Sequence, residues 1–416
     1  MRICLLSYRG YKYSGGQGIY VRYLSSSLQK LGHEVDVLAG PPYPELVEGI
    51  NLVKLPSLDL YRLSEPRRLF INPLWLNTWP NFVEWVGECG GYFTEPKTFA
   101  MRAYNAFRQN GRGKKYDIVH DNQCITEGIL KIHQLGIPLV TTIHHPITID
   151  RELALKASRS MMQSWGIRRW YSFADTQIKV AGQLSHFITD SKHSLQEITE
   201  SFGLAADKFR IIYCGVDREV FREVPGSVRP SNRILVINSG DTPLKGLKYL
   251  LEAIAEIRRT KDIELVIVGE PMKNGYTQGL IESLKLSDCA RYTGKIDTDK
   301  LVQHYSEATM LVVPSIYEGF GLPAAEAMAC GAPVISTTAG ALPEVVGDAG
   351  ILVPPGDTRA IVEAINTLLD DDNRRRQLGA LGKERVARLF NWDTAAKETA
   401  EVYRDAIEKQ AYVKAG

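Results

Sequence analysis

Two glutamates, Glu318 and Glu326, flank a short glycine-containing segment in the C-terminal half of the chain. The apolar run at 310–314 predicts a strand, the residues after it predict a loop, and Pro323 predicts the first turn of an alanine-rich helix. Unpaired backbone N–H groups and the positive end of a helix dipole attract anions at such a junction. Carboxylates repel phosphate, so we expect the two glutamates to accept hydrogen bonds from hydroxyl groups instead.

A ligand with phosphates in its centre and hydroxyl groups at both ends fits this segment. A sugar nucleotide has that chemistry, because it joins a hexose to a ribose through a diphosphate. The alternative is an ordinary strand-to-helix turn with exposed acids, and a pair of glutamates alone favours that alternative.

Two further side chains could act on the same ligand. Lys245 precedes Gly246 and a predicted helix, and a lysine there can reach a diphosphate as a point charge. His144 lies in a loop directly after a strand predicted at 137–142, and α/β sheets place their chemistry at strand ends. His145 is a candidate only because it is adjacent to His144. A satisfied loop histidine is the alternative for His144.

A cluster of glycines, Gly15, Gly16 and Gly18, follows a first strand predicted at 2–7. Glycines ahead of a helix favour phosphate binding, but the dinucleotide fingerprint G-x-G-x-x-G would need a third glycine where Val21 stands. The pattern therefore argues against an NAD site. A phosphate-binding loop and a turn that needs positive φ both stay open.

Predicted strands alternate with helices along both halves of the chain, which indicates parallel α/β sheets. A chain of 416 residues is too long for one core. The segment 218–233 contains two prolines and a glycine and predicts a linker. We therefore expect two Rossmann-like domains, residues 1–217 and residues 218–392.

The composition is that of an ordinary soluble protein, with 44% hydrophobic residues, 24% charged residues and a formal net charge of +2. The six cysteines are scattered without a C-x-x-C pair, which argues against a zinc site and a disulfide framework. We expect no signal peptide and no membrane-spanning run. No D-x-D cluster is flanked by a strand, so we expect no bound metal. The prediction is a cytoplasmic protein that does not bind nucleic acid.

Aromatic and basic residues are concentrated in three segments of the first half. The segment 70–107 is rich in Phe, Trp and Tyr, the segment 97–115 contains several Lys and Arg residues and no acid, and the segment 151–179 combines both kinds. Such a surface fits lipid headgroups or a lipid-carried acceptor, and it predicts a peripheral contact with an anionic membrane. The alternative is a core helix with a solvated basic face.

The full string around the two glutamates is Glu-Gly-Phe-Gly-Leu-Pro-x-x-Glu followed by Ala-Met-Ala-Cys-Gly-Ala-Pro-Val-Ile. It resembles the signature of the retaining glycosyltransferases of the GT-B fold, specifically family 4, in which seven residues separate two glutamates. The resemblance implies that Glu318 contacts the donor hexose and that Glu326 contacts the donor ribose. Thr142-Ile143-His144 is similar to the family's T-x-H, whose histidine lies beside the donor sugar.

Shorter matches extend the resemblance along the chain. Lys245-Gly246 resembles the Lys-Gly that meets the donor diphosphate, and the loop with Gly15 and Gly16 would approach that diphosphate from the opposite domain. Gly294-Lys295-Ile296 resembles the segment whose backbone meets the nucleobase. The resemblance assigns catalysis to His144, Lys245 and Glu318, and donor binding to Gly15, Gly16, Gly240, Lys245, Ile296, Glu318, Gly319, Phe320, Gly321, Leu322 and Glu326.

The chain departs from the family pattern ahead of Lys245. The family has Gly-Arg at the positions six and five residues before this lysine, and here Ser239 and Gly240 stand there. The absent arginine normally shares the stabilisation of the diphosphate. Arg9 or Lys12 could supply the charge, or backbone N–H groups could carry more of the load.

The resemblance implies retaining transfer from a nucleoside-diphosphate sugar to a hydroxyl acceptor, either lipid-linked or part of a cell-envelope glycan, without cofactor or metal. Residues 218–392 would bind the donor across a cleft from the first domain, which would bind the acceptor, and a terminal helix at 393–416 would cross back to the first domain. The expected location is the cytoplasm, at the inner face of the membrane. The alternatives are a non-hydrolysing sugar-nucleotide epimerase of the same fold and a non-catalytic sugar-nucleotide-binding protein.

Overall fold

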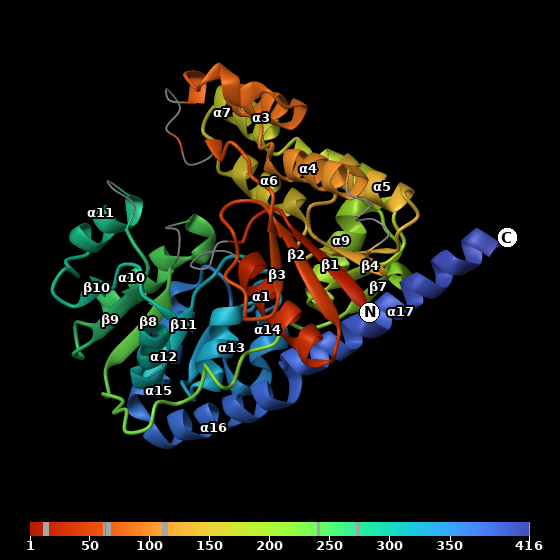
Figure 1. The fold of residues 1–416 in the computed structure, drawn as a ribbon. Helices are drawn as coiled ribbons and strands as arrows, with labels where there is room; N and C mark the ends of the chain where they lie inside the picture. Colours follow the sequence, from red (N-terminus) through yellow and green to blue (C-terminus); the bar gives the residue numbers. More distant parts are fainter. Residues whose placement is uncertain are drawn as a thin grey trace. The chain divides into compact units, whose positions relative to one another are not determined.

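The computed structural model divides the chain into two compact units. The first unit contains Met1–Asp190, Ser194–Ile212 and Asp393–Gly416, and the second contains Ser191–His193 and Tyr213–Trp392. The boundary between the two units lies between Ile212 and Tyr213, a few residues before the boundary that we expected at residue 217. From Asp393 onward the terminal helix α17 (Trp392–Ala415) belongs to the first unit, as expected (Figure 1). The structure describes residues 1–10, 16–60, 63, 68–109, 115–238, 242–271 and 275–415.

The first unit is built on a parallel sheet. Its described strands lie in the order β3-β2-β1-β4-β5-β6-β7, so the chain starts in the middle of the sheet and extends it first to one side and then to the other. The strands are β1 (Arg2–Ser7), β2 (Glu34–Ala39), β3 (Asn51–Lys54), β4 (Ile118–Asn122), β5 (Leu139–Thr142), β6 (Phe187–Thr189) and β7 (Phe209–Ile211). The helices are α1 (Gly16–Lys30), η2 (Pro73–Leu76), α3 (Trp79–Cys89), α4 (Glu95–Gln109), α5 (Glu127–Gln134), α6 (Ile147–Lys156), α7 (Met161–Trp170), α8 (Phe173–Ala181), α9 (Lys192–Phe202) and η4 (Ala206–Lys208).

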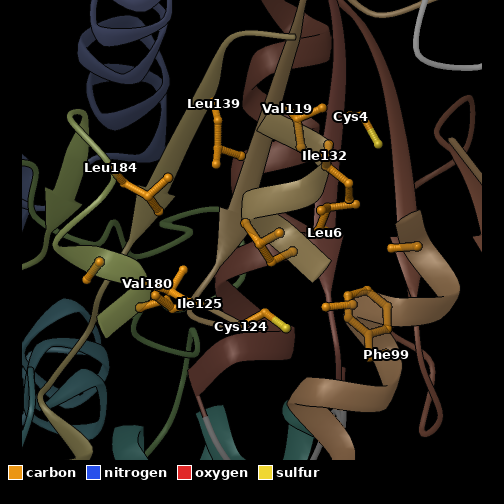
Figure 2. Packing of buried hydrophobic residues seen from close by; sticks show 14 of the residues in the cluster. Cys4, Leu6, Phe99, Val119, Cys124, Ile125, Ile132, Leu139, Val180 and Leu184 are labelled. Atoms are coloured by element: carbon orange, nitrogen blue, oxygen red, sulfur yellow. The ribbon is translucent and has the colours of Figure 1, made fainter. Parts of the chain in front are cut away.

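Apolar residues line both faces of this sheet, because helices cover parallel strands on both sides. In β1, Cys4 and Leu6 belong to a buried cluster with Phe99 of α4 and Ile132 of α5, as Figure 2 shows. Leu5 points to the opposite face, since side chains alternate along a strand. Burial on both sides holds the C-terminal edge of the sheet in place, and the loops at that edge carry the candidate histidine.

The second unit repeats the plan with a smaller parallel sheet. Its described strands lie in the order β10-β9-β8-β11-β12-β13. Its core joins the sheet to α10 and α15. The strands are β8 (Arg233–Ile237), β9 (Glu264–Val268), β10 (Ala290–Tyr292), β11 (Met310–Val313), β12 (Val334–Thr337) and β13 (Gly350–Val353). The helices are η5 (Pro243–Lys245), α10 (Leu247–Ile257), α11 (Tyr276–Ser283), α12 (Thr298–Glu307), α13 (Leu322–Ala329), α14 (Leu342–Val346), η6 (Gly347–Ala349), α15 (Thr358–Asp370) and α16 (Asp372–Leu389).

Helix α4 is a core helix with one buried charge. It packs Phe99, Ala103 and Phe107 into the first core. Its Arg102 side chain, 10% exposed, donates to the buried Glu84 carboxylate of α3 at 2.5 Å. The acid-free segment therefore does not present all of its cations to solvent. Within the described residues, no helix has the length and apolarity needed to cross a bilayer.

Replacing Arg102 with alanine is expected to destabilise the first unit by about 3–5 kcal/mol, because Glu84 would stay buried without its cation. Lys97→Ala is the matched control, since Lys97 lies exposed on the same helix, and it should cost less than about 0.5 kcal/mol. Urea unfolding followed by tryptophan fluorescence measures both, because most of the tryptophans lie in the first unit. Equal midpoints for the two variants would contradict the buried-pair argument.

Candidate functional site

The strand-to-helix junction of the second unit has the predicted form. Strand β11 is fully buried, and α13 begins at Leu322 with a proline in its first turn. Gly321 has a φ of 100°, and a Cβ atom there would meet the Leu342 side chain at 2.7 Å. Only glycine fits this position without strain. Because Gly321 is the N-cap residue and has no side chain, no side-chain cap occupies the backbone N–H groups at the start of α13.

A lysine and a glutamate from separate segments meet beside this junction. The Lys245 ammonium donates to Glu318 Oε2 at 2.7 Å, and the Ser315 hydroxyl donates to the same oxygen at 3.2 Å. The Lys245 side chain is 28% exposed and that of Glu318 is 13% exposed. The pair lines a small hollow at the C-terminal ends of β8 and β11. A partly buried cation and carboxylate thus stand at a helix N-terminus, where an anion is favoured.

Gly246 explains how Lys245 reaches Glu318. It has a φ of 64°, and a Cβ atom there would lie 1.9 Å from the carbonyl oxygen of Pro314. The missing side chain lets η5 pack directly against the end of β11, and the Ile316 N–H donates to the Leu244 carbonyl at 2.8 Å. In the Lys245-Gly246 pair, the lysine therefore supplies the charge, and the glycine permits the close backbone contact that brings this lysine to Glu318.

Glu326 is buried one turn into α13 and is 7% exposed. Its Oε2 accepts a hydrogen bond from the Tyr305 hydroxyl of α12 at 2.9 Å. Burial raises the pKa of Glu326 to about 7, and the hydrogen bond from Tyr305 opposes that shift. The charge of Glu326 therefore changes close to neutral pH.

His144 lies in the first unit, in the loop after β5, and is held by three neighbours. Its Nδ1 is 3.1 Å from Asp190 Oδ2, and its Nε2 is 2.8 Å from Asn122 Oδ1. The Tyr20 ring packs perpendicular to the imidazole with centroids 4.7 Å apart. The adjacent His145 makes a separate pair, because its Nε2 contacts Asp150 at 3.0 Å.

The loop after β4 fixes the backbone on which His144 stands. Gln123 has a φ of 57°, and its side-chain oxygen accepts from the His144 N–H at 2.9 Å while its amide donates to the His145 carbonyl at 2.8 Å. The buried Asp121 carboxylate accepts from two backbone N–H groups of this loop, at 3.2 and 3.0 Å. Left-handed backbone costs about 1–3 kcal/mol at a residue other than glycine, and these buried hydrogen bonds hold it.

A second histidine at this edge is neutral. His120 is fully buried, and its two ring nitrogens contact the Thr142 hydroxyl and the Tyr403 hydroxyl, each at 2.6 Å. Burial, and then the charge of His144, lowers the pKa of His120 to about 3. Tyr403 lies in α17, so this buried contact anchors the terminal helix to the first unit.

Several other residues were predicted to take part in the site. Gly16 begins α1, and Ile296 lies in the loop after β10. Phe320 is buried and packs edge-on against Phe390 at 5.7 Å, which leaves its backbone as the part that a ligand could contact. Arg9 is engaged by Glu95 at 2.7 Å. Gly15, Gly240 and the alternative cation Lys12 lie outside the described residues.

Sequence reasoning missed the partners of the candidate residues. Asn122 is the last residue of β4 and Asp190 directly follows β6, and a polar residue at a strand end is a signal that could have found them. Tyr20 and Tyr305 lie inside helices, where nothing in the sequence separates them from core tyrosines.

Two family models match the chain and together span most of it. The model described as "Glycosyltransferase Family 4" matches residues 14–220, and the model described as "Glycosyl transferases group 1" matches residues 217–385. The candidate residues of the first unit fall in the first match, and those of the second unit fall in the second.

Individual relatives agree with the family models. The chain is 42% identical over 415 residues to an MMP alpha-(1->4)-mannosyltransferase of Mycolicibacterium hassiacum, covering 99% of this chain and 100% of the relative. A sucrose-phosphate synthase from Thermosynechococcus elongatus has a TM-score of 0.74 at 25% identity, covering 98% of this chain and 100% of that structure. The Anabaena protein HepE in complex with UDP has a TM-score of 0.69 at 17% identity and shows the same fold, covering 97% of this chain and 100% of that structure.

The two parallel-sheet units are therefore the Rossmann-like domains of the GT-B fold. The 42% identity to a mannosyltransferase extends over 99% of this chain and 100% of the relative, so the two proteins belong to one family. The chain belongs to the family 4, group 1 glycosyltransferases of the GT-B fold.

Proposed function

We propose that this glycosyltransferase transfers a mannosyl group from a nucleoside-diphosphate mannose to a hydroxyl group of a saccharide, with retention of configuration. The observation that carries the proposal is the pairing of Lys245 with Glu318 beside the free N-terminus of α13, with Glu326 one turn further on. A cation and helix N–H groups suit a diphosphate, and two carboxylates suit the hydroxyl groups on either side of it. The name of the 42% identical relative, an alpha-(1->4)-mannosyltransferase, supports the choice of a mannosyl group and of an α-(1→4) linkage.

The ion pair prepares both side chains for the donor. Lys245 and Glu318 hold each other in place at 2.7 Å, with Ser315 supporting the carboxylate. A diphosphate competes with Glu318 for the ammonium, and the released carboxylate then accepts hydrogen bonds from hexose hydroxyls. Diphosphate binding by Lys245 and hexose binding by Glu318 are therefore coupled. A sugar nucleotide separates the two side chains and gives each of them a new partner.

The reaction breaks the bond between the anomeric carbon and the diphosphate oxygen, and the electron pair leaves with the diphosphate. The acceptor oxygen forms the new bond on the same face, and its proton passes to the departing phosphate. Lys245 and the N–H groups of α13 stabilise the growing negative charge. Nucleoside-diphosphate mannose is α-linked, so an α-mannoside product means retention. No carboxylate of the site acts as a nucleophile, and we expect activity without added metal, since the ammonium and the helix N-terminus supply the positive charge.

A surface of the first unit favours contact with a membrane. The aromatic surface comprises η2, α3 and α7; η2 packs on α3, and α3 and α7 lie at the same end of the unit (Figure 1). Arg169 of α7 lies between the rings of Tyr92 and Trp165, 4.8 Å from each centroid, which joins the segments. Trp79 is 66% exposed and Met161 is 92% exposed. Other exposed large residues of these segments and their flanks include Leu69, Phe70, Leu74, Trp75, Phe82, Val86, Tyr92, Met162 and Trp165.

The charges around the aromatic surface suit anionic lipid. Glu84 and Glu88 of α3 are buried and paired with arginines, so they add no negative charge outside. Lys156, Arg159 and Arg168 are exposed nearby in sequence. Exposed aromatic and methionine side chains with a basic rim fit the lipid headgroup region, and we propose that this surface brings the enzyme to anionic membrane that carries its acceptor.

Released nucleoside diphosphate, measured over a panel of sugar nucleotides with and without mannoside acceptors, tests the transferase. Lys245→Ala should lower kcat about a hundredfold or more, near 3 kcal/mol, because its contact strengthens as the diphosphate leaves. Lys245→Arg should recover only part. Lys248→Ala is the matched control, since Lys248 lies in the next turn and pairs with Glu252. Near-normal turnover in Lys245→Ala would overturn this placement of the donor.

Glu326→Gln should weaken donor binding with little change in kcat, because a ribose contact is equally strong in the ground and transition states. In the unaltered protein, donor affinity should fall as the pH drops below about 7, since Glu326, with its pKa raised to about 7, then gains a proton and accepts fewer hydrogen bonds. Calorimetry between pH 5.5 and 8.5 measures both effects. The ribose assignment fails if the variant binds the donor as tightly as the unaltered protein at pH 8.

The protein should sediment with anionic but not with neutral vesicles, and salt should weaken the binding. Trp79→Ser combined with Trp165→Ser removes two exposed rings and should abolish it. Tyr276→Ser is the control, because Tyr276 is an exposed aromatic residue of the second unit. If the protein sediments with neither kind of vesicle at low salt, the membrane proposal is wrong, and the aromatic surface is then a contact for another protein.

A further inference from the structure

A buried amide in the second unit has no hydrogen-bond partner for its side chain. Asn238 directly follows β8 and is 1% exposed, and neither its Nδ2 nor its Oδ1 has a partner among the described residues. We propose that Asn238 is a further donor-binding residue, whose amide forms hydrogen bonds with hydroxyl groups of the donor hexose. The inference rests on the proposed donor site beside Lys245 and Glu318 and adds a residue to it.

The Asn238 amide differs from the polar side chains next to it in the donor site. Lys245 and Ser315 both donate to Glu318. A buried amide without hydrogen bonds costs free energy, because it has given up its contact with water without a replacement. Native proteins keep few such groups, so each of them calls for an explanation, such as a role in catalysis or a bound water molecule.

Strand β8 fixes the direction of the Asn238 side chain. The Asn238 N–H donates to the Val268 carbonyl of β9 at 2.9 Å, which continues the pairing of the two strands. Val236, two residues earlier, packs into the core between the sheet and α10. Side chains alternate along a strand, so Asn238 is the next residue on the face that α10 covers. Helix α10 begins two residues after Lys245, so the amide and the lysine lie at the same end of this face.

The hollow of the donor site opens at the same place. Val312 of β11 belongs to the same core face as Val236, and it lines the hollow together with Pro314, Lys245 and Glu318. The volume of the hollow is about 30 Å³, enough for one group the size of a water molecule. Ligands of α/β sheets bind at the carboxyl ends of the strands where the strand order reverses, and here the order reverses between β8 and β11.

The amide also indicates which part of the donor it binds. A phosphate oxygen only accepts hydrogen bonds and would leave Oδ1 unpaired, whereas neighbouring sugar hydroxyl groups can accept from Nδ2 and donate to Oδ1. Glu318 lines the hollow and is the carboxylate that we propose for the hexose. Glu326, which we propose for the ribose, is not among the described residues that line it. The hydroxyl groups therefore belong to the hexose.

The ion pair of Lys245 and Glu318 covers the hollow in the free protein. Both side chains line it, and their charged atoms are 2.7 Å apart. A donor that draws Lys245 to its diphosphate and Glu318 to its hexose separates the pair and widens the hollow. The hexose then reaches the strand end at which Asn238 lies, so the amide gains its partners only when a hexose is bound.

Replacing Asn238 with leucine separates a ligand-binding role from a structural one. Leucine is close to asparagine in size and has no polar side-chain atom, so the free protein should lose no hydrogen bond. The Tm of free Asn238→Leu should equal or exceed that of the unaltered protein. Thr399→Val is the matched control, because the buried Thr399 hydroxyl of α17 also has no partner among the described residues.

Calorimetry with and without a hexose tests the contact itself. The probes are GDP-mannose and UDP-mannose, with GDP and UDP as their hexose-free counterparts. In Asn238→Leu, the mannose form that the unaltered protein prefers should bind about tenfold more weakly, because the hydrogen bonds to the hexose are lost. The matching nucleoside diphosphate should bind as before. Thr399→Val should bind both as the unaltered protein does, and Asn238→Ala repeats the comparison without the bulk of leucine.

The outcomes distinguish this inference from the proposed function. If both Asn238 variants bind the mannose form and the nucleoside diphosphate equally less well, the amide does not contact the hexose, and the proposal is wrong. Unchanged binding of both ligands, or a Tm that falls in Asn238→Leu but not in Thr399→Val, would overturn it as well. If the unaltered protein itself binds no sugar nucleotide, the proposed function fails, and the role of Asn238 fails with it.

Discussion

The candidate donor site depends on the close approach of two backbone segments, η5 and the end of β11. Gly246 makes the approach possible, because any side chain there would collide with the Pro314 carbonyl. The contact brings Lys245 onto Glu318 from a position 73 residues away in the chain. The charge, the carboxylate and the helix N-terminus then act on the same small space, where each is worth more than it would be in water.

The first unit uses buried polar groups for a similar purpose. Asp121 holds a strained loop, the loop presents Gln123, and Gln123 fixes the backbone of His144 and His145. A buried hydrogen-bonded network of this kind favours one geometry, since breaking one bond leaves another buried group without its partner. The position of the His144 ring is therefore set by residues that need not touch a substrate themselves.

Side chains of the same type have different partners in this protein. His120 lies within β4, and its ring nitrogens contact only hydroxyl groups, so it stays neutral; His144 lies in the loop after the neighbouring β5 and contacts a carboxylate. Glu318 faces a lysine, whereas Glu326 has one tyrosine hydroxyl as its partner and a pKa near neutrality. Groups whose environments differ in this way can take separate roles within one reaction.

The sequence by itself determined the alternation of strands and helices, the two-domain GT-B plan and the positions of Glu318, Glu326, Lys245 and His144, because these depend on local patterns and short motifs. Tertiary structure decided which residues hold those side chains. Asp190, Asn122 and Tyr305 come from other elements. Asn122 and Asp190 stand at strand ends, but nothing in the local sequence shows that they contact His144, and Tyr305 resembles an ordinary core tyrosine. It also decided that Arg102 pairs with the buried Glu84, because a helix made of basic and apolar residues does not reveal which cation its neighbour will cover. Spacing along the chain identifies a motif, whereas burial and contact between distant elements set its charge and geometry.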